Sequence, residues 1–192
     1  MGSENTHPDS ESIMKYVAVL RGINVSGQKS IKMADLKILF ESLGFENIQT
    51  YVQSGNVIFD SAIKSAEKLM QLIEGVIEKK YKFYVPVLIR SKNELKKIID
   101  ACPFGSVDLS SDGTKVLLTF LSSKPKAVNI KAIQEHVALP EQLIVQGKEV
   151  YLYCPNGYGK SKLSNNFLEK KLVVGATTRN WKSVCKLLEL AS

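Results

Sequence analysis

The pattern of apolar and polar positions divides the first half of the chain into six elements in the order βαββαβ. Residues 15–20 form an apolar run, which is typical of a central strand covered on both faces. Apolar residues recur at helical spacing over 33–43 and over 69–81, so both segments predict amphipathic helices. Between them, β-branched and aromatic residues in 48–59 predict a hairpin, and 83–89 predicts a fourth strand.

The second half repeats most of this order after a linking helix. Ser91 and Glu94 have the spacing of a capping box at the start of that helix, which ends near residues 102–103. The repeat then consists of a strand at 115–121, a helix over 130–137, a hairpin formed by 142–146 and 149–154, and a helix over 163–172. Only 173–176 is available for a last strand before a final helix that begins at Trp181. A short edge strand and the absence of one therefore both stay open.

These repeats predict an α+β fold that is a tandem duplication of two ferredoxin-like (βαββαβ) units with an extra linking helix and a C-terminal helix. The hairpin turns at Ser54-Gly55 and at Gly147-Lys148 fall at equivalent places in the two halves. We divide the chain into a disordered leader at 1–13, a first unit at 14–90, a linking helix and loop at 91–113, and a second unit with the C-terminal helix at 114–192.

Two loops differ most between the halves. The loop at 21–32 is much longer than its counterpart at 122–125, and the loop at 155–162 is longer than its counterpart at 60–62. We take the first and third strands of each unit to be adjacent and parallel, so the loops that follow them should emerge at the same end of a sheet. Elaborated loops on a rigid scaffold are common positions for binding sites.

Donors and cations dominate these loops, and almost no carboxylate accompanies them. Singly, each lysine is more often a solvated surface residue, but together they suit a phosphate or carboxylate group. Part of this set also precedes helices, whose free N–H groups attract anions. We therefore predict one pocket between the units, formed by Arg21, Asn24, Ser54, Asn56, Lys160, Lys162, Arg179 and Asn180.

Composition restricts the functional classes further. The formal net charge of +7 favours anionic partners without requiring them. Cys102, Cys154 and Cys185 are odd in number and far apart, and His136 is the only histidine outside the leader, so we predict no metal site. The opening residues are polar and no apolar run is long enough to cross a bilayer, so we expect a cytoplasmic protein with no membrane partner.

Two nucleotide-related motifs are incomplete. Gly159-Lys160-Ser161 follows a predicted strand and precedes a helix, as in a phosphate-binding loop, but the first glycine of that motif would fall on Cys154. The order βαββαβ is also that of RNA-recognition domains, yet the third strand does not carry their basic-Gly-aromatic pattern.

Four ordered motifs resemble the bacterial family called domain of unknown function 1697. They are Leu20-Arg21-Gly22-Ile23-Asn24-Val25, Tyr51 with Ser54-Gly55-Asn56-Val57, Tyr158-Gly159-Lys160-Ser161-Lys162, and Thr178-Arg179-Asn180-Trp181. The resemblance spans residues 14 to about 190 and implies a duplicated ferredoxin-like structure. It implies no established activity, substrate or cofactor, but it indicates that the motif residues act together.

Three hypotheses for function remain. The first is a binding module for a phosphate-bearing small molecule or nucleotide, because the loops are cationic and poor in acids. The second is an RNA- or DNA-binding module, which requires an exposed sheet and a continuous basic face. The third is a small enzyme for a phosphorylated or carboxylated substrate, with Lys160 or Lys162 stabilising charge and Tyr51 or Tyr158 donating a proton. No cofactor is indicated.

Overall fold

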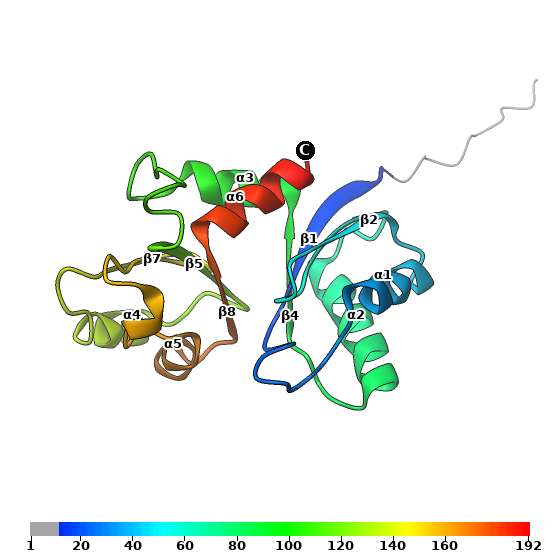
Figure 1. Ribbon diagram of the computed structural model, residues 1–192, viewed down its shortest axis with the longest axis horizontal. Coiled ribbons are helices and arrows are strands. Elements are labelled where there is room, and N and C mark those ends of the chain that lie inside the picture. The colour runs from blue at the N-terminus through cyan, green and yellow to red at the C-terminus, as the bar shows by residue number, and fades with distance from the viewer. Residues whose placement is uncertain (1–11) are drawn as a thin grey trace, which may run out of the picture.

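The computed structural model describes residues 12–192, and residues 1–11 of the expected leader lie outside this range. The described chain forms two four-stranded sheets that lie side by side, with helices around them (Figure 1). Its elements are β1 (Met14–Leu20), α1 (Met33–Ser42), β2 (Glu46–Tyr51), β3 (Asn56–Ser61), α2 (Ala66–Tyr81), β4 (Val87–Ser91), α3 (Lys92–Asp100), β5 (Val116–Leu121), α4 (Ala127–Gln134), β6 (Gln142–Gln146), β7 (Glu149–Tyr153), a 3-10 turn (Tyr158–Lys160), α5 (Asn165–Leu172), β8 (Ala176–Asn180) and α6 (Trp181–Leu190).

Both sheets are antiparallel and have the same strand order, β2-β3-β1-β4 in the first half and β6-β7-β5-β8 in the second. The expectation that the first and third strands are parallel is wrong. β3 lies between β1 and β2, which run parallel to each other, and β3 pairs antiparallel with both. Val19 near the end of β1 lies opposite Asn56 at the start of β3, and Phe120 lies opposite Glu149 in the same way. The loop after each first strand therefore lies next to a hairpin turn.

The last strand is longer than 173–176 allowed, and it lies further along the chain. β8 pairs with β5 from Ala176, opposite Leu121, to Asn180, opposite Leu117. Val173 instead ends α5 in the left-handed conformation, with φ of 57°. Two consecutive threonines favour an extended backbone, and pairing with the apolar β5 extends it through Arg179, which sequence analysis had placed in a loop.

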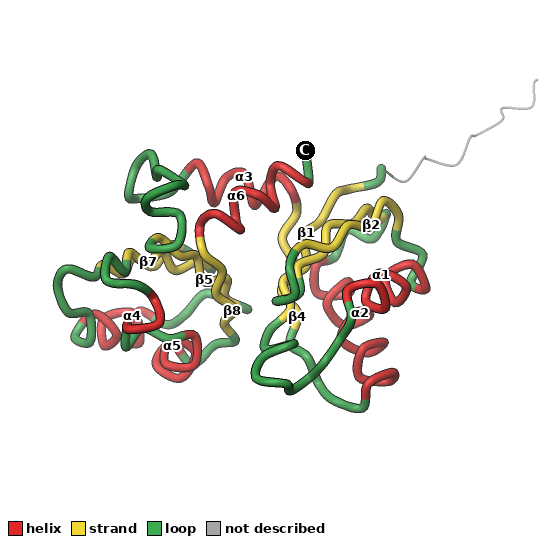
Figure 2. The backbone as a smooth tube through the Cα atoms, viewed as in Figure 1, coloured by secondary structure: helices red, strands yellow, loops and turns green. Residues whose placement is uncertain are grey.

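Three apolar cores stabilise the arrangement. α1 and α2 cover one face of the first sheet, where Leu36 and Phe40 are fully buried, and α4 and α5 cover the corresponding face of the second. The third core joins the opposite faces of both sheets to α3 and α6 through Ile58, Leu118 and Trp181. Figure 2 shows these two helices across one side of the gap between the halves. Both faces of each sheet are thus covered within the described chain.

The helices of the third core begin directly after the edge strands β4 and β8. The predicted capping box is present, since Ser91 Oγ accepts from Glu94 N at 3.2 Å and Glu94 Oε2 accepts from Ser91 N at 2.7 Å. At the equivalent position Asn180 Oδ1 accepts from Ser183 N at 2.8 Å. These caps stop each edge strand at a defined residue. No helix among residues 12–192 combines the length and apolar content that a bilayer span requires.

Truncating Leu36 should measure how much the core between the first sheet and the helices α1 and α2 contributes to stability. The side chain is fully buried, so Leu36→Ala should lower the free energy of unfolding by about 2 to 5 kcal/mol in urea melts. Ile38 lies two residues further on in α1 and is 56% exposed. Ile38→Ala should therefore change the free energy of unfolding by less than about 0.5 kcal/mol. Equal losses in the two variants would contradict the assigned helix face.

Candidate functional site

Two arginines at equivalent positions cross from one half of the molecule to the other. Arg90 in β4 lies opposite Val17 of β1, and Arg179 in β8 lies opposite Leu118 of β5. Each directly precedes the residue that caps the following helix. The two side chains therefore leave equivalent edge strands at the same register, and each reaches the opposite sheet.

Arg90 binds the end of the first strand, the hairpin turn and the start of the third strand in the second half. Its Nη2 donates to Leu121 O at 3.0 Å and to Lys148 O at 3.3 Å. Its Nε pairs with the carboxylate of Glu149 at 3.0 Å. The Arg90 side chain is only 5% exposed, so its charge is buried together with a compensating one.

Arg179 makes the equivalent contacts in the first half. Its Nη2 donates to Leu20 O at 2.6 Å, Ser54 O at 3.0 Å and Gly55 O at 3.3 Å. Its Nε donates to Asn56 Oδ1 at 2.7 Å. An amide thus stands where Arg90 has a carboxylate, and no carboxylate of residues 12–192 forms an ion pair with Arg179.

The turn that receives Arg179 depends on a glycine. Gly55 has φ of 85°, and a Cβ there would lie 2.5 Å from Cδ1 of Ile23 in the long first loop. The loop and the turn therefore pack without room for a side chain. This close contact fixes the carbonyls of Ser54 and Gly55 where the guanidinium can reach them.

Arg179 stays cationic although its surroundings disfavour charge. The residue is partly exposed, but burial of the guanidinium lowers the pKa of Arg179 to about 10. Its Nη1 donates one hydrogen to Thr178 O at 3.0 Å. A guanidinium has five N–H groups, so Nη1 keeps a second hydrogen that no described residue accepts.

A cleft of about 910 Å³ lies at this boundary between the halves. Three cations line it and no carboxylate does. The first half contributes Arg21, Gly22, Val25, Ser26, Gln28, Lys29, Tyr84 and Pro86, and the second half contributes Tyr158, Asn165, Asn166, Thr177, Thr178 and Arg179. The volume falls within the range of small-molecule sites.

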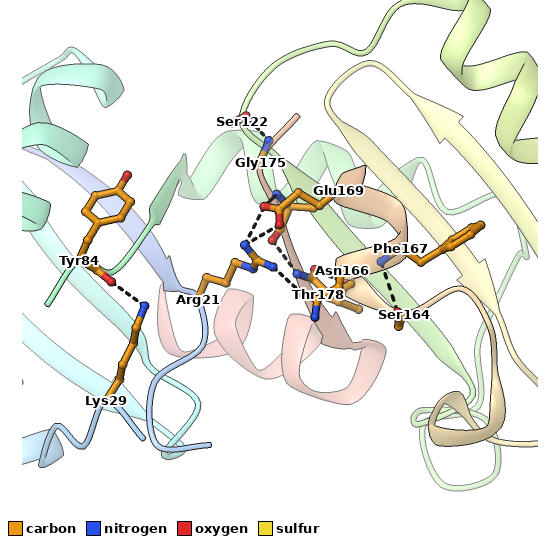
Figure 3. Close-up of polar contacts among 12 residues, drawn as sticks. Arg21, Lys29, Tyr84, Ser122, Ser164, Asn166, Phe167, Glu169, Gly175 and Thr178 are labelled. Atoms are coloured by element: carbon orange, nitrogen blue, oxygen red, sulfur yellow. Dashed lines mark hydrogen bonds and ion pairs between the residues drawn. The ribbon is translucent and has the colours of Figure 1, made fainter. Parts of the chain in front are cut away.

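Arg21 links the first loop to α5 across the cleft (Figure 3). Its Nη1 lies 2.6 Å from Oε2 and 2.8 Å from Oε1 of Glu169, and its Nη2 donates to Asn166 Oδ1 at 2.7 Å. The expectation of a site almost free of carboxylates is therefore wrong for Arg21, whose charge Glu169 compensates. Lys29 Nζ donates to Tyr84 O at 2.7 Å, so the charge of Lys29 has only a neutral partner.

Two hydroxyl groups in the cleft wall are buried without a hydrogen-bond partner among the described residues, those of Tyr158 and Thr177. Thr177 is only 2% exposed. Burial raises the pKa of Tyr158, and the nearby Thr178 hydroxyl opposes part of this shift without a hydrogen bond of ordinary geometry. Thr178 instead bonds Thr119 Oγ1 at 2.8 Å and Asn165 Oδ1 at 2.9 Å. Buried polar groups normally have partners, so a ligand donor or acceptor fits here.

The structure separates the eight residues predicted from the sequence. Arg21 and Arg179 line the cleft, and Ser54 and Asn56 hold Arg179 through their oxygen atoms. Asn24 fixes the first loop, because its Nδ2 donates to Ile31 O at 2.9 Å and to Gln53 O at 2.8 Å. Asn180 caps α6, as described above.

Lys160 and Lys162 line a different cavity of about 790 Å³, together with Asn156, Glu135 and Glu141. Antiparallel pairing explains this, because β7 ends with Tyr153 opposite Val116, at the beginning of β5 rather than at its end. Of this loop, only Tyr158 reaches the cleft.

Sequence analysis missed several residues of the boundary, among them Arg90, Asn166, Glu169 and Thr177. A comparison of Arg90-Ser91 with Arg179-Asn180 as equivalent positions of the repeat could have identified Arg90. Among the described residues, no group of three or more His, Cys, Asp or Glu side chains is close enough to hold a metal ion.

The fold and this boundary define an α+β protein built of two four-stranded antiparallel sheets with a polar cleft between its halves. A family model described as Protein of unknown function (DUF1697) matches residues 13–151, so the chain belongs to this family. This confirms the resemblance, although the motifs at Tyr158 and Thr178 lie outside the matched residues.

A solved structure of the conserved bacterial protein SP0830 from Streptococcus pneumoniae is similar to this chain, with a TM-score of 0.74 and 24% sequence identity. The similarity covers 94% of this chain and 100% of that one, and at this identity it shows the fold alone. Among curated proteins no sequence matches.

Removing the Arg90 side chain from its buried ion pair with Glu149 should destabilise the protein strongly. Arg90→Met leaves the Glu149 carboxylate without its cation and removes the donor to Leu121 O, so the free energy of unfolding should fall by about 3 to 5 kcal/mol in urea melts. Lys96 pairs with Asp100 on the surface, with both side chains about 60% exposed, and Lys96→Met should cost less than about 0.5 kcal/mol. A loss below about 1 kcal/mol in Arg90→Met would mean that this contact does not join the halves.

Tyr158→Phe should leave stability unchanged or raise it by about 1 kcal/mol, because the hydroxyl has no partner. Tyr151→Phe is the matched control, since Tyr151 OH donates to Ile98 O at 2.7 Å and its removal should cost about 1 kcal/mol.

A comparison of Tyr158→Phe with the wild type tests the sign of the Tyr158 pKa shift. The folded-state pKa of Tyr158 is raised, so the stability that the neutral phenol contributes is complete below its unfolded pKa of about 10. It is lost as pH rises through the folded pKa. Tyr158→Phe should therefore lose less stability than the wild type between about pH 10 and 11 in urea melts. A parallel decline would show that Tyr158 is not buried as described.

Proposed function

We propose that the cleft binds a small molecule through an anionic group, a phosphate or a carboxylate, at Arg179. The observation that carries this proposal is the difference between the two equivalent arginines. Arg90 has a carboxylate in Glu149, whereas Arg179 has the amide of Asn56 and is a partly buried cation without an anion among the described residues. A partly buried charge without a partner is unfavourable, so a ligand anion would supply the missing partner.

The surroundings of Arg179 suit a phosphate. Arg179, which has a free Nη1 hydrogen, lines the same cleft as Tyr158, Thr177 and Lys29. Charge-assisted hydrogen bonds from arginine to phosphate are short and strong. The Tyr158 phenol, whose pKa burial raises further above the ordinary value of about 10, is neutral at pH 7 and can donate a hydrogen bond. A nucleotide belongs to this class of ligand.

The two other hypotheses have less support. Nucleic-acid binding depended on an exposed sheet, but both sheets are covered by helices or by the third core. Catalysis depended on Lys160 or Lys162 acting with Tyr51 or Tyr158, but the lysines line another cavity and Tyr51 packs against the third core. A binding protein therefore fits the geometry better than an enzyme.

We also propose that the halves are ferredoxin-like units related by duplication, at 14–90 and 114–192, joined by 91–113. The identical strand order and the equivalent arginines support this. Three free cysteines suit a reducing compartment, which supports our proposal of the cytoplasm.

Inorganic phosphate and acetate are the direct probes of the proposed anion site. At constant ionic strength set with chloride, phosphate should raise the melting temperature of the wild type and give a saturable heat in calorimetry. Arg179→Gln should weaken this binding at least tenfold, and Lys29→Ala should weaken it less. Lys160→Ala is the matched control and should bind as the wild type does, because Lys160 lines the other cavity.

Two outcomes would contradict the proposal. One is that neither phosphate nor acetate binds beyond the effect of chloride. The other is that Lys160→Ala weakens binding as much as Arg179→Gln does. Arg179 also joins the halves, so Lys29→Ala, whose side chain comes from the first loop, keeps the test valid if Arg179→Gln is unstable.

A further inference from the structure

Another cavity, of about 320 Å³, lies beside the cleft at the boundary between the halves. The two share three lining residues, Tyr84, Pro86 and Thr177. The rest of the inner wall comes from α2 and β4 in the first half and from α5, β8 and the loop after β5 in the second, through Met70, Glu74, Val87, Leu88, Ser122, Glu169, Gly175 and Ala176. We call this second cavity the inner cavity.

Apart from the Thr177 hydroxyl at the junction with the cleft, the main polar groups of the inner cavity have partners. Val87 N donates to Glu74 Oε1 at 2.9 Å, and Gly175 N donates to Ser122 Oγ at 2.9 Å. Ala176 N donates to Glu169 Oε1 at 3.1 Å. Because these donors and acceptors are paired with each other, the surface left for a ligand is largely that of the apolar side chains.

The ion pair of Arg21 and Glu169 lies where the two cavities meet. Arg21 lines the cleft and Glu169 lines the inner cavity, and Figure 3 shows their side chains meeting beside Gly175 and Ser122. Arg21 compensates the charge of Glu169, so this carboxylate does not repel an anion at Arg179 strongly. The two cavities thus differ in character. The cleft is cationic, whereas the inner cavity has two carboxylates, of which Glu169 pairs with Arg21 and Glu74 accepts from Val87 N, beside the apolar side chains of Met70, Val87 and Leu88.

The size of the inner cavity limits what can enter it. A volume near 320 Å³ is at the lower end of small-molecule sites, and a helix about 10 Å across does not fit. Apolar surface that a ligand removes from water contributes favourably to binding in proportion to its area. A short aliphatic chain or one aromatic ring matches these limits.

We infer that the ligand anchored at Arg179 is amphipathic, and that its apolar part occupies the inner cavity. This inference rests on the proposed anion site in the cleft. The ligand class is then an organic phosphate or carboxylate with an aliphatic chain or a single ring, and Thr177 lies at the junction of its two parts.

A series of alkyl phosphates tests this directly. Calorimetry with inorganic, methyl, butyl and hexyl phosphate should show the dissociation constant falling about threefold to fourfold for each methylene that enters the inner cavity. The gain should stop when the chain fills the cavity. Phenyl phosphate should bind more tightly than inorganic phosphate for the same reason.

Variants that fill the inner cavity separate this effect from general hydrophobic adhesion. Met70→Trp adds bulk from α2, and Ala176→Leu adds bulk from β8; both residues line the inner cavity and not the cleft. Both should remove most of the chain-length dependence while changing the affinity for inorganic phosphate by less than about threefold. Val128→Trp is the matched control, because Val128 is 68% exposed on α4 and lines neither cavity, and it should keep the full dependence.

The outcomes distinguish the inference from the function on which it rests. If all phosphates bind equally tightly and Arg179→Gln weakens them all, the anion site stands and the inner cavity holds no ligand group. If chain length matters equally in Met70→Trp, Ala176→Leu and the wild type, the apolar part binds elsewhere and the inference is overturned. If neither the phosphates nor acetate bind, the proposed function fails and this inference fails with it.

Discussion

The reciprocal contacts of Arg90 and Arg179 are the constraint on which the arrangement of the two halves depends. Each guanidinium leaves an edge strand of one half and binds carbonyls at the end of the central strand and in the hairpin turn of the other. A planar group with five donors in fixed directions accepts little displacement of those carbonyls. The third core alone would favour contact between the sheets without fixing it, because apolar packing is not directional. The two arginines fix the relative orientation of the halves, because each makes directional hydrogen bonds to the opposite half.

The difference between these arginines connects the fold to a function. Glu149 completes one contact with an opposite charge, and Asn56 leaves the other cationic. Asn56 is itself fully buried and donates to Tyr51 O at 2.9 Å, so a carboxylate at this position would face a carbonyl instead of a donor. The uncompensated charge thus follows from the local structure of the first hairpin. It opens on the cleft that the long first loop and α5 enclose, where buried hydroxyl groups also lack partners.

The position of the cleft also follows from the way the halves are joined. α3 and α6 cross one side of the gap and cover the sheet faces that meet there, while α2 and α5 lie on the other side (Figure 1). On that second side, Arg21 of the first half contacts Glu169 and Asn166 of α5 in the second half. An ion pair of this kind, with both side chains about a quarter exposed, contributes little to stability. It therefore suits the entrance of a site better than the interior of a core.

The sequence by itself determined most of the secondary structure and the similar order of elements in the two halves. Apolar periodicity located the helices around Leu36 and Ile73, and the spacing of Ser91 and Glu94 located the cap of α3, because such signals act within a few residues. It also singled out Arg21, Asn56 and Arg179 from their motifs. Only the tertiary structure decided which of them meet. Antiparallel pairing carried Lys160 and Lys162 to another cavity, and pairing with β5 turned Arg179 from a loop residue into a strand residue that reaches the first half. Glu169 entered the site in the same way, since a contact between residues almost 150 positions apart leaves no local pattern in the sequence.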